Sequence, residues 1–166
     1  MSPAITIRFA TADDVPLVLR LIRALAAFEQ SADAVVATEE DLRRHAFGPE
    51  PQFEGILAFL DGEPAGVALF HARFSTWLGR PGMFLEDLYV TEAARGQGVG
   101  RRLMARLAGI AVERGWGRID FHVVDWNPAR DFYHRLGMGP VGGWLRYGAD
   151  EEGLRRLADE DRRDGD

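Results

Sequence analysis

Two adjacent acids interrupt an otherwise apolar segment in the middle of the chain. Glu86 and Asp87 lie within residues 83–90, where every other residue is hydrophobic. A carboxylate is costly in a buried strand unless it is paired or has a function. Such a group could act as a general base or hold a cation. Because side chains alternate along a strand, we expect the two acids to point to opposite faces of it.

A glycine-rich loop follows the acids. Beginning at Arg95, the chain reads Arg-Gly-Gln-Gly-Val-Gly-Arg, between an apolar strand and an amphipathic helix. Gly96, Gly98 and Gly100 permit a tight turn that leaves backbone N–H groups at the helix start, where the helix dipole favours an anion. Arg95 and Arg101 flank the loop with guanidinium groups, which suit phosphate. The spacing predicts a pyrophosphate cradle, with a purely structural turn as the alternative, whereas a dinucleotide fingerprint needs glycine where Arg101 stands.

The hydrophobic pattern around these residues predicts the element order β-α-α-β-β-β-α-β-α-β-α. Strands are expected at residues 5–9, 55–60, 64–73, 83–90, 119–124 and 144–147. Helices are expected after residue 11, from residue 38, at residues 98–114, at residues 127–137 and at residues 151–158. Asp61-Gly62 favours a hairpin between the second and third strands. This order predicts an α/β (α+β) fold, and the length suits a single domain over residues 1–166.

The composition removes several function classes. The 166 residues include no cysteine, and every one of the 20 basic residues is arginine, which excludes disulfides, thiolate metal sites and the lysine-dependent phosphate-binding loop. The net charge of −6 argues against a nucleic-acid partner and is compatible with a cationic small substrate. No signal peptide or membrane span is visible, so we expect a cytoplasmic protein without a membrane partner, and the missing lysine suggests a GC-rich bacterial genome. The four histidines lack metal-ligand spacing, so each is expected at the surface or satisfied in the core, and no metal is expected.

The glycine loop resembles the acyl-CoA loop of the GNAT superfamily of N-acetyltransferases. The preceding Phe-Leu-Glu-Asp-Leu-Tyr-Val segment, the later Asp-Trp-Asn and the Phe132-Tyr133 pair resemble the diamine (spermidine/spermine) acetyltransferases, and the likeness covers roughly residues 4–158. It implies a GNAT-type domain on a mixed, mostly antiparallel sheet flanked by helices. It also implies an enzyme that moves an acetyl group from acetyl-CoA to a primary amine of a small cation, such as a polyamine, a diamine or a thialysine-like amino acid. The transfer would be a direct attack in a ternary complex.

The resemblance assigns a role to each part of the site. Acetyl-CoA would be held by the backbone after the acids, by the glycine loop and by the start of the following helix, at Leu88, Tyr89, Val90, Arg95, Gly96, Gln97, Gly98, Val99, Gly100, Arg101, Asn127, Pro128, Ala129 and Arg130. Tyr133 would be the general acid for the departing thiolate, and Glu86 the base, with Asp87 as its alternative. The amine would be bound by residues lining the acidic side of the cleft, namely Phe28, Glu29, Glu86, Asp87, Asp120, Phe121 and His122.

Several alternatives stay open. Asn127 could simply cap a helix, and Tyr133 could be a core residue. Phe28 stands where the family often has tyrosine, which weakens the polyamine assignment more than the acetyltransferase one. A non-catalytic acyl-CoA sensor, an enzyme for an antibiotic or protein amine, and an unrelated binding module are the competing functions. The family is usually dimeric, and residues 144–157 are the expected homodimer surface.

Overall fold

In the computed structural model of this chain, residues 3–143 and 145–163 are described. The chain divides into two units, Met1–Phe132 and Tyr133–Asp166, and each is described by itself. The single-domain organisation expected from the length therefore stays a prediction.

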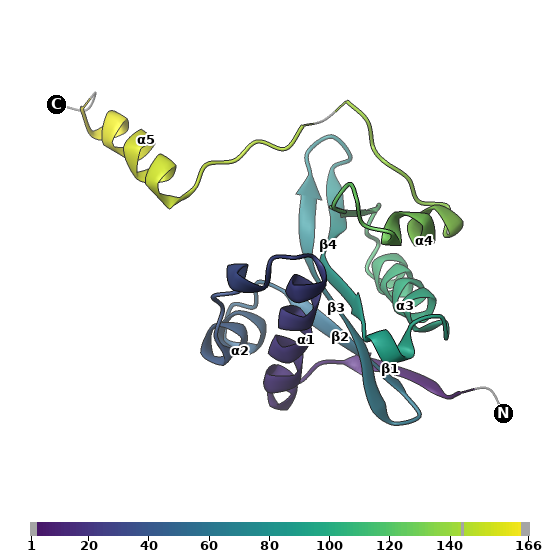
Figure 1. The fold of residues 1–166 in the computed structure, drawn as a ribbon. Coiled ribbons are helices and arrows are strands. Elements are labelled where there is room, and N and C mark those ends of the chain that lie inside the picture. Colours follow the sequence, from purple (N-terminus) through teal and green to yellow (C-terminus); the bar gives the residue numbers. More distant parts are fainter. Residues whose placement is uncertain (1–2, 144, 164–166) are drawn as a thin grey trace. The chain divides into compact units, whose positions relative to one another are not determined.

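The first unit is built on one five-stranded sheet with the order β1-β2-β3-β4-β5 (Figure 1). The strands are β1 (Ile5–Phe9), β2 (Glu54–Leu60), β3 (Glu63–Ser75), β4 (Arg80–Val90) and β5 (Ile119–Phe121). The pairs among β1 to β4 are antiparallel, and β5 runs parallel to β4. This arrangement confirms the predicted mixed, mostly antiparallel sheet.

Helices cover both faces of this sheet. Helices α1 (Val15–Phe28) and α2 (Glu39–Phe47) pack on the face that carries Leu57, Val67 and Leu69. Helix α3 (Val99–Glu113) lies on the opposite face in Figure 1 and buries an apolar stripe that includes Leu103 and Leu107. We call these the α1 face and the α3 face.

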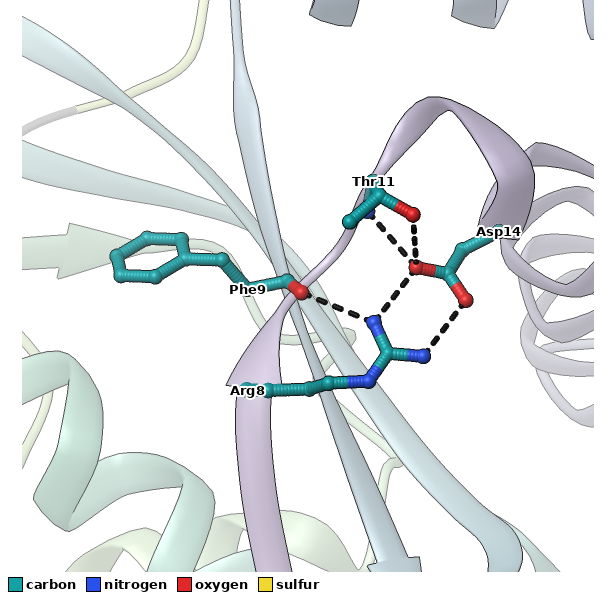
Figure 2. A network of polar contacts seen from close by, with 4 residues as sticks. All are labelled: Arg8, Phe9, Thr11 and Asp14. Carbon is teal, nitrogen blue, oxygen red and sulfur yellow. Dashed lines mark hydrogen bonds and ion pairs between the residues drawn. The ribbon is translucent and has the colours of Figure 1, made fainter.

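An ion pair between Arg8 and Asp14 connects β1 to the start of α1. Both guanidinium nitrogens of Arg8 donate to the carboxylate of Asp14, at 2.7 and 2.8 Å, and Thr11 donates to the same carboxylate through its amide and hydroxyl groups (Figure 2). The bond from Arg8 holds the pKa of Asp14 well below its usual range. Arg8 also donates to the carbonyl oxygen of Phe9, so the end of the strand is tied to the start of the helix.

The hairpin predicted at Asp61-Gly62 is confirmed, and the helix expected from residue 38 begins with a side-chain cap. Asp61 and Gly62 form the β2–β3 turn, both with positive φ, as a two-residue hairpin loop requires. Thr38 and Asp41 form a reciprocal capping box at the start of α2.

The strand predictions fail near the C-terminus. β5 ends at Phe121 rather than at residue 124. Residues 145–147 form no strand, and Trp144 lies outside the described residues. Helix α5 (Glu151–Arg163) confirms the predicted tail helix, and α4 (Ala129–Arg135) begins in the first unit and ends in the second.

Candidate functional site

A bulge in β4 brings the two candidate acids to one face of the sheet. Leu85 pairs with Phe70 of β3 and Asp87 pairs with the preceding Leu69, so Glu86 is an extra residue in β4. Asp87 therefore shares the face of Leu69, which packs against α1. The bulge interrupts the regular alternation of side chains at Glu86.

Glu86 lies on the same α1 face as Asp87. Its Oε1 is 3.1 Å from Nε2 of His71, which lies two residues after Leu69 on β3 and so on the same face. The expectation that the acids point to opposite faces is therefore wrong. The reason is the extra residue, which no periodicity in the sequence reveals.

The carboxyl group of Asp87 has a raised pKa. Burial raises its pKa to about 6, and the charges of Glu86 and Glu29 add to the effect. Glu29 directly follows α1 and is its C-cap residue. These three residues, which we call the acidic group, concentrate negative charge at one place on the α1 face. Such a group can attract a cation, and Asp87 can gain or lose a proton near neutral pH.

Arg95 connects the acidic side of the site to the glycine loop. Its guanidinium lies 4.6 Å from the ring centre of Phe28 and 5.8 Å from that of Tyr89, and its Nε donates to the carbonyl of Val90 at 3.2 Å. Phe28 is thus held at the end of α1, next to Glu29.

The other predicted amine-binding residues are distributed over both faces. His122 packs edge-on against Phe84, with ring centres 5.2 Å apart, and Phe84 pairs with His71. Asp120 forms an ion pair with Arg118 at 2.6 Å, so its charge is already compensated.

Phe121 does not belong to the acidic face. It pairs with Leu85, which shares the α3 face with Phe70, because neighbouring paired residues lie on the same side of a sheet. Its predicted contact with the amine stays a prediction, and the strand register places its side chain on the α3 face.

The glycine loop has the geometry of an anion cradle. Gly96 and Gly98 have φ of 75° and 86°, a region that other residues rarely adopt, and Gly98 caps α3. The first hydrogen bond of helix α3 runs from the amide of Arg102 to the carbonyl of Gly98. The amides of the α3 residues before Arg102 therefore take no part in the hydrogen bonds of the helix. Val99 is buried and anchors the start of α3 in the core.

Gly100 has a different role in the same loop. A Cβ atom at Gly100 would lie 3.3 Å from the ring of Phe132 and 3.7 Å from Val90. The missing side chain therefore lets α3 approach the end of β4 and the start of α4. Gln97 donates to the carbonyl of Ala93 and stabilises the turn before the helix. These residues fit a pyrophosphate group, because the backbone amides at the start of α3 lie next to a glycine-rich loop.

Strand β4 continues beyond the end of its neighbour. Its pairing with β5 covers Met83, Phe84 and Leu85, whereas β4 itself runs on to Val90. The edge of β4 at residues 88–90 therefore extends past the described end of β5. A strand-like ligand arm could pair with this edge.

Asn127 caps the first turn of α4. It is buried, and its Oδ1 accepts a bond from the amide of Ala129 at 2.9 Å across Pro128. Arg130 donates from its side chain to the carbonyl of Asp125 at 2.7 Å. The helix-cap interpretation of Asn127 is confirmed, and contact of these residues with acetyl-CoA stays a prediction.

Tyr133 lies on α4 and belongs to the second unit. Its carbonyl accepts bonds from the amides of Leu136 and Met138, which end the helix at Gly137 with φ of 78°. The predicted end of this helix at Gly137 is confirmed, and the role of Tyr133 as an acid stays a prediction.

His71 is the residue that sequence reasoning missed. Its ring packs on Phe84 with centres 5.4 Å apart, its Nε2 faces Glu86 and its Nδ1 lies 3.1 Å from the carbonyl of Ala72. Only the register of the β3–β4 pair places it opposite Phe84, and the sequence holds no short motif for that register. Within the described residues, no group of three potential ligands forms a metal site, and no helix has the length and apolar character of a membrane span.

Known proteins resemble this chain in sequence and in fold. The model of the acetyltransferase (GNAT) family matches residues 20–138. The thialysine N-epsilon-acetyltransferase of Bos taurus is 36% identical, over 93% of this chain and 97% of its own length. The spermidine/spermine N(1)-acetyltransferase-like protein 1 of Homo sapiens is 34% identical, over 92% of this chain and 23% of its own.

The fold comparison agrees with the sequence comparison. The solved structure of an integron cassette protein from the mobile metagenome of V. cholerae superposes with a TM-score of 0.77 and 26% identity, over 95% of this chain and 98% of that one. The family match covers more than half of the chain and includes β4, the glycine loop and α4. The chain belongs to the GNAT family of acetyltransferases and is an N-acetyltransferase.

Proposed function

We propose that the protein transfers an acetyl group from acetyl-CoA to a primary amine of a small cationic substrate, by direct attack in a ternary complex. The substrate class is a polyamine, a diamine or a thialysine-like amino acid. The observation that carries this proposal is the acidic group on the α1 face, on the strand that leads into the glycine loop. The names of the relatives, which are thialysine and spermidine/spermine acetyltransferases, support the same class.

The acidic group divides two tasks. The side chain of Glu86 is half exposed, which suits the capture of a cation arriving from solvent. An alkyl ammonium has a pKa of about 10.4 and must lose a proton before it can attack. Asp87, with a pKa raised to about 6 by burial, is ionised at neutral pH and can take that proton. We therefore assign proton removal to Asp87 and substrate binding to Glu86, which reverses their order in the sequence-based expectation.

The remaining residues hold the cosubstrate and complete the transfer. The amides of Gly98 to Arg101 would bind the pyrophosphate, the β4 edge at residues 88–90 would pair with the pantetheine arm, and the amide of Leu88 would polarise the acetyl carbonyl. Acetyl-CoA supplies an activated thioester. Tyr133 would protonate the departing thiolate; the phenol, with a pKa of about 10, is a slightly weaker acid than the thiol at about 8.5, and the two values are close enough for this proton to move at the end of the reaction.

Thiol release from acetyl-CoA in the presence of each amine tests the proposal. We expect turnover with polyamines, diamines or thialysine, and a kcat/KM that falls at acid pH with an apparent pKa near that of Asp87. Asp87→Asn and Tyr133→Phe should lower kcat at least tenfold, whereas Glu86→Gln should mainly raise KM. Asp33→Asn, an exposed acid of the same type, is the control.

Two outcomes would contradict the assignment. Thermal stabilisation by acetyl-CoA with no thiol release from any amine would point to a non-catalytic acyl-CoA sensor. Full activity in Asp87→Asn with a strong loss in Glu86→Gln would restore Glu86 as the base.

We also propose that the protein is a cytoplasmic homodimer. Apolar side chains along the described C-terminal segment are exposed, at Val141, Leu145, Tyr147, Leu154 and Leu157. Removing them from water against a second copy would be favourable. Light scattering at micromolar concentration should give twice the mass of one chain, and a strict monomer would refute the dimer.

A further inference from the structure

A hollow of about 670 Å³ opens beside the acidic group, at the ends of β1, β2 and β3 and next to the last turn of α2. Its volume lies in the range of small-molecule sites. Four aromatic residues contribute to its wall, namely Phe9, Phe47, Phe53 and Trp116. Neither the glycine loop nor any predicted amine-binding residue lines it.

His71 joins this hollow to the acidic group. The residue lines the hollow, and its Nε2 is 3.1 Å from Glu86. Stacking on Phe84 holds the ring in that place. The hollow therefore ends one side chain away from the carboxylate that we assign to amine binding. A ligand whose ammonium group reaches Glu86 can extend past His71 into the hollow.

The wall of the hollow carries no uncompensated negative charge. Glu54 is the one carboxylate among the described residues that line it, and both of its oxygens accept bonds from Arg114, at 2.5 and 2.8 Å. The Arg114 guanidinium in turn lies 5.0 Å from the ring centre of Trp116. A second ammonium group would find no free carboxylate here, whereas an uncharged body would meet aromatic rings.

Two of the rings are partly exposed, and the Arg106 guanidinium lies 5.7 Å from the ring centre of one of them, Phe9. Phe9 and Phe47 each keep 39% of their surface accessible. Figure 2 shows the ring of Phe9 pointing away from the Arg8–Asp14 ion pair, which ties down its backbone. A guest that covers these rings removes apolar surface from water at both partners.

We propose that the hollow binds the uncharged apolar or aromatic body of the amine acceptor while its ammonium group lies at Glu86. This inference rests on the proposed acetyl transfer, and it ranks amines with an uncharged far end above the diamines and polyamines named there. The preferred acceptor is a primary amine with one charged end, and a second ammonium at the far end lowers the preference.

A series of amines tests the length and charge of the acceptor. We expect kcat/KM to rise about threefold for each methylene from ethylamine to hexylamine, since each adds buried apolar surface. We expect 1,6-diaminohexane to be at least tenfold poorer than hexylamine. Turnover that is independent of chain length, or a diamine better than hexylamine, would overturn the inference and leave the proposed acetyl transfer intact.

A pair of matched variants locates the effect. Phe47→Ala should lower the ratio of kcat/KM for hexylamine to that for ethylamine at least fivefold. Phe74→Ala removes an equally large exposed ring from the β3–β4 hairpin, outside the hollow, and should leave that ratio unchanged. Equal ratios in the two variants would move the amine body to another surface.

Calorimetry separates failure of this inference from failure of the proposed function. If no amine is acetylated, the proposed function fails, and binding of 2-phenylethylamine to the protein decides the hollow by itself. Binding that is lost in Phe47→Ala and kept in Phe74→Ala would support the hollow. Absence of binding in the wild-type protein would overturn it.

Discussion

Replacing Asp87 by asparagine should stabilise the protein at alkaline pH. Burial beside Glu86 and Glu29 raises the pKa of Asp87 from 3.8 to about 6. At ~1.4 kcal/mol per pH unit, the ionised carboxylate costs about 3 kcal/mol of unfolding free energy at pH 8. Asparagine has nearly the same shape and carries no charge, so it avoids this cost.

The sign of the pH dependence follows from where the proton is held. The folded protein keeps the Asp87 proton to higher pH than the unfolded chain does. The contribution is therefore fully present below about pH 3.8 and is lost as pH rises through about 6. Relative to wild type, Asp87→Asn should gain about 2 kcal/mol between pH 4 and pH 8.

Urea unfolding followed by tryptophan fluorescence measures this gain. Wild type, Asp87→Asn and the exposed control Asp33→Asn would be compared at pH 4, 6 and 8. Adding Glu29→Gln to the wild type should shrink the effect, because Glu29 is one of its causes. A difference between wild type and Asp87→Asn that does not change with pH, or that grows toward acid pH, would refute the buried acidic group.

Two further predictions concern the elements that frame the site. Asp14→Ala should lower the free energy of unfolding by about 2 kcal/mol at pH 7 because it removes charged hydrogen bonds from Arg8. Since the pKa of Asp14 is depressed, this loss, measured by urea unfolding, should fade as the pH falls below about 3.8. A loss that stays constant with pH would contradict the ion pair. Gly98→Glu should abolish acetyl-CoA binding in calorimetry because it places a carboxylate in the anion cradle. Gly62→Glu, with the similar φ of 89° and open space around it, should carry the same backbone strain and bind normally; equal affinities in the two variants would move the cradle elsewhere.

Local patterns in the sequence predicted most of the fold. The hairpin turn at Asp61-Gly62, the capping box at Thr38 and the left-handed glycines of the loop depend on neighbouring residues, which the sequence shows directly. The strand expected at residues 144–147 depended on pairing with a distant segment of the chain, and residues 145–147 form no strand. Local chemistry could be deduced, whereas pairing between distant segments could not.

The candidate site shows the same division. The acids and the glycine loop were found from residue type and spacing alone. The bulge at Glu86, the contact of Glu86 with His71 and the face of Phe121 all follow from strand register, which a single residue can shift. The position of Phe121 on the α3 face and the contact of His71 with Glu86 are therefore set by strand register rather than by local chemistry.

The extra residue in β4 also separates what the sheet requires from what the site requires. Without Glu86, Leu85 would still pair with Phe70 and Asp87 with Leu69, and the alternation would become regular. The architecture can thus do without the residue that the proposed chemistry uses. A one-residue insertion into such a strand is a way for evolution to add a functional group to an existing scaffold without redesigning its core.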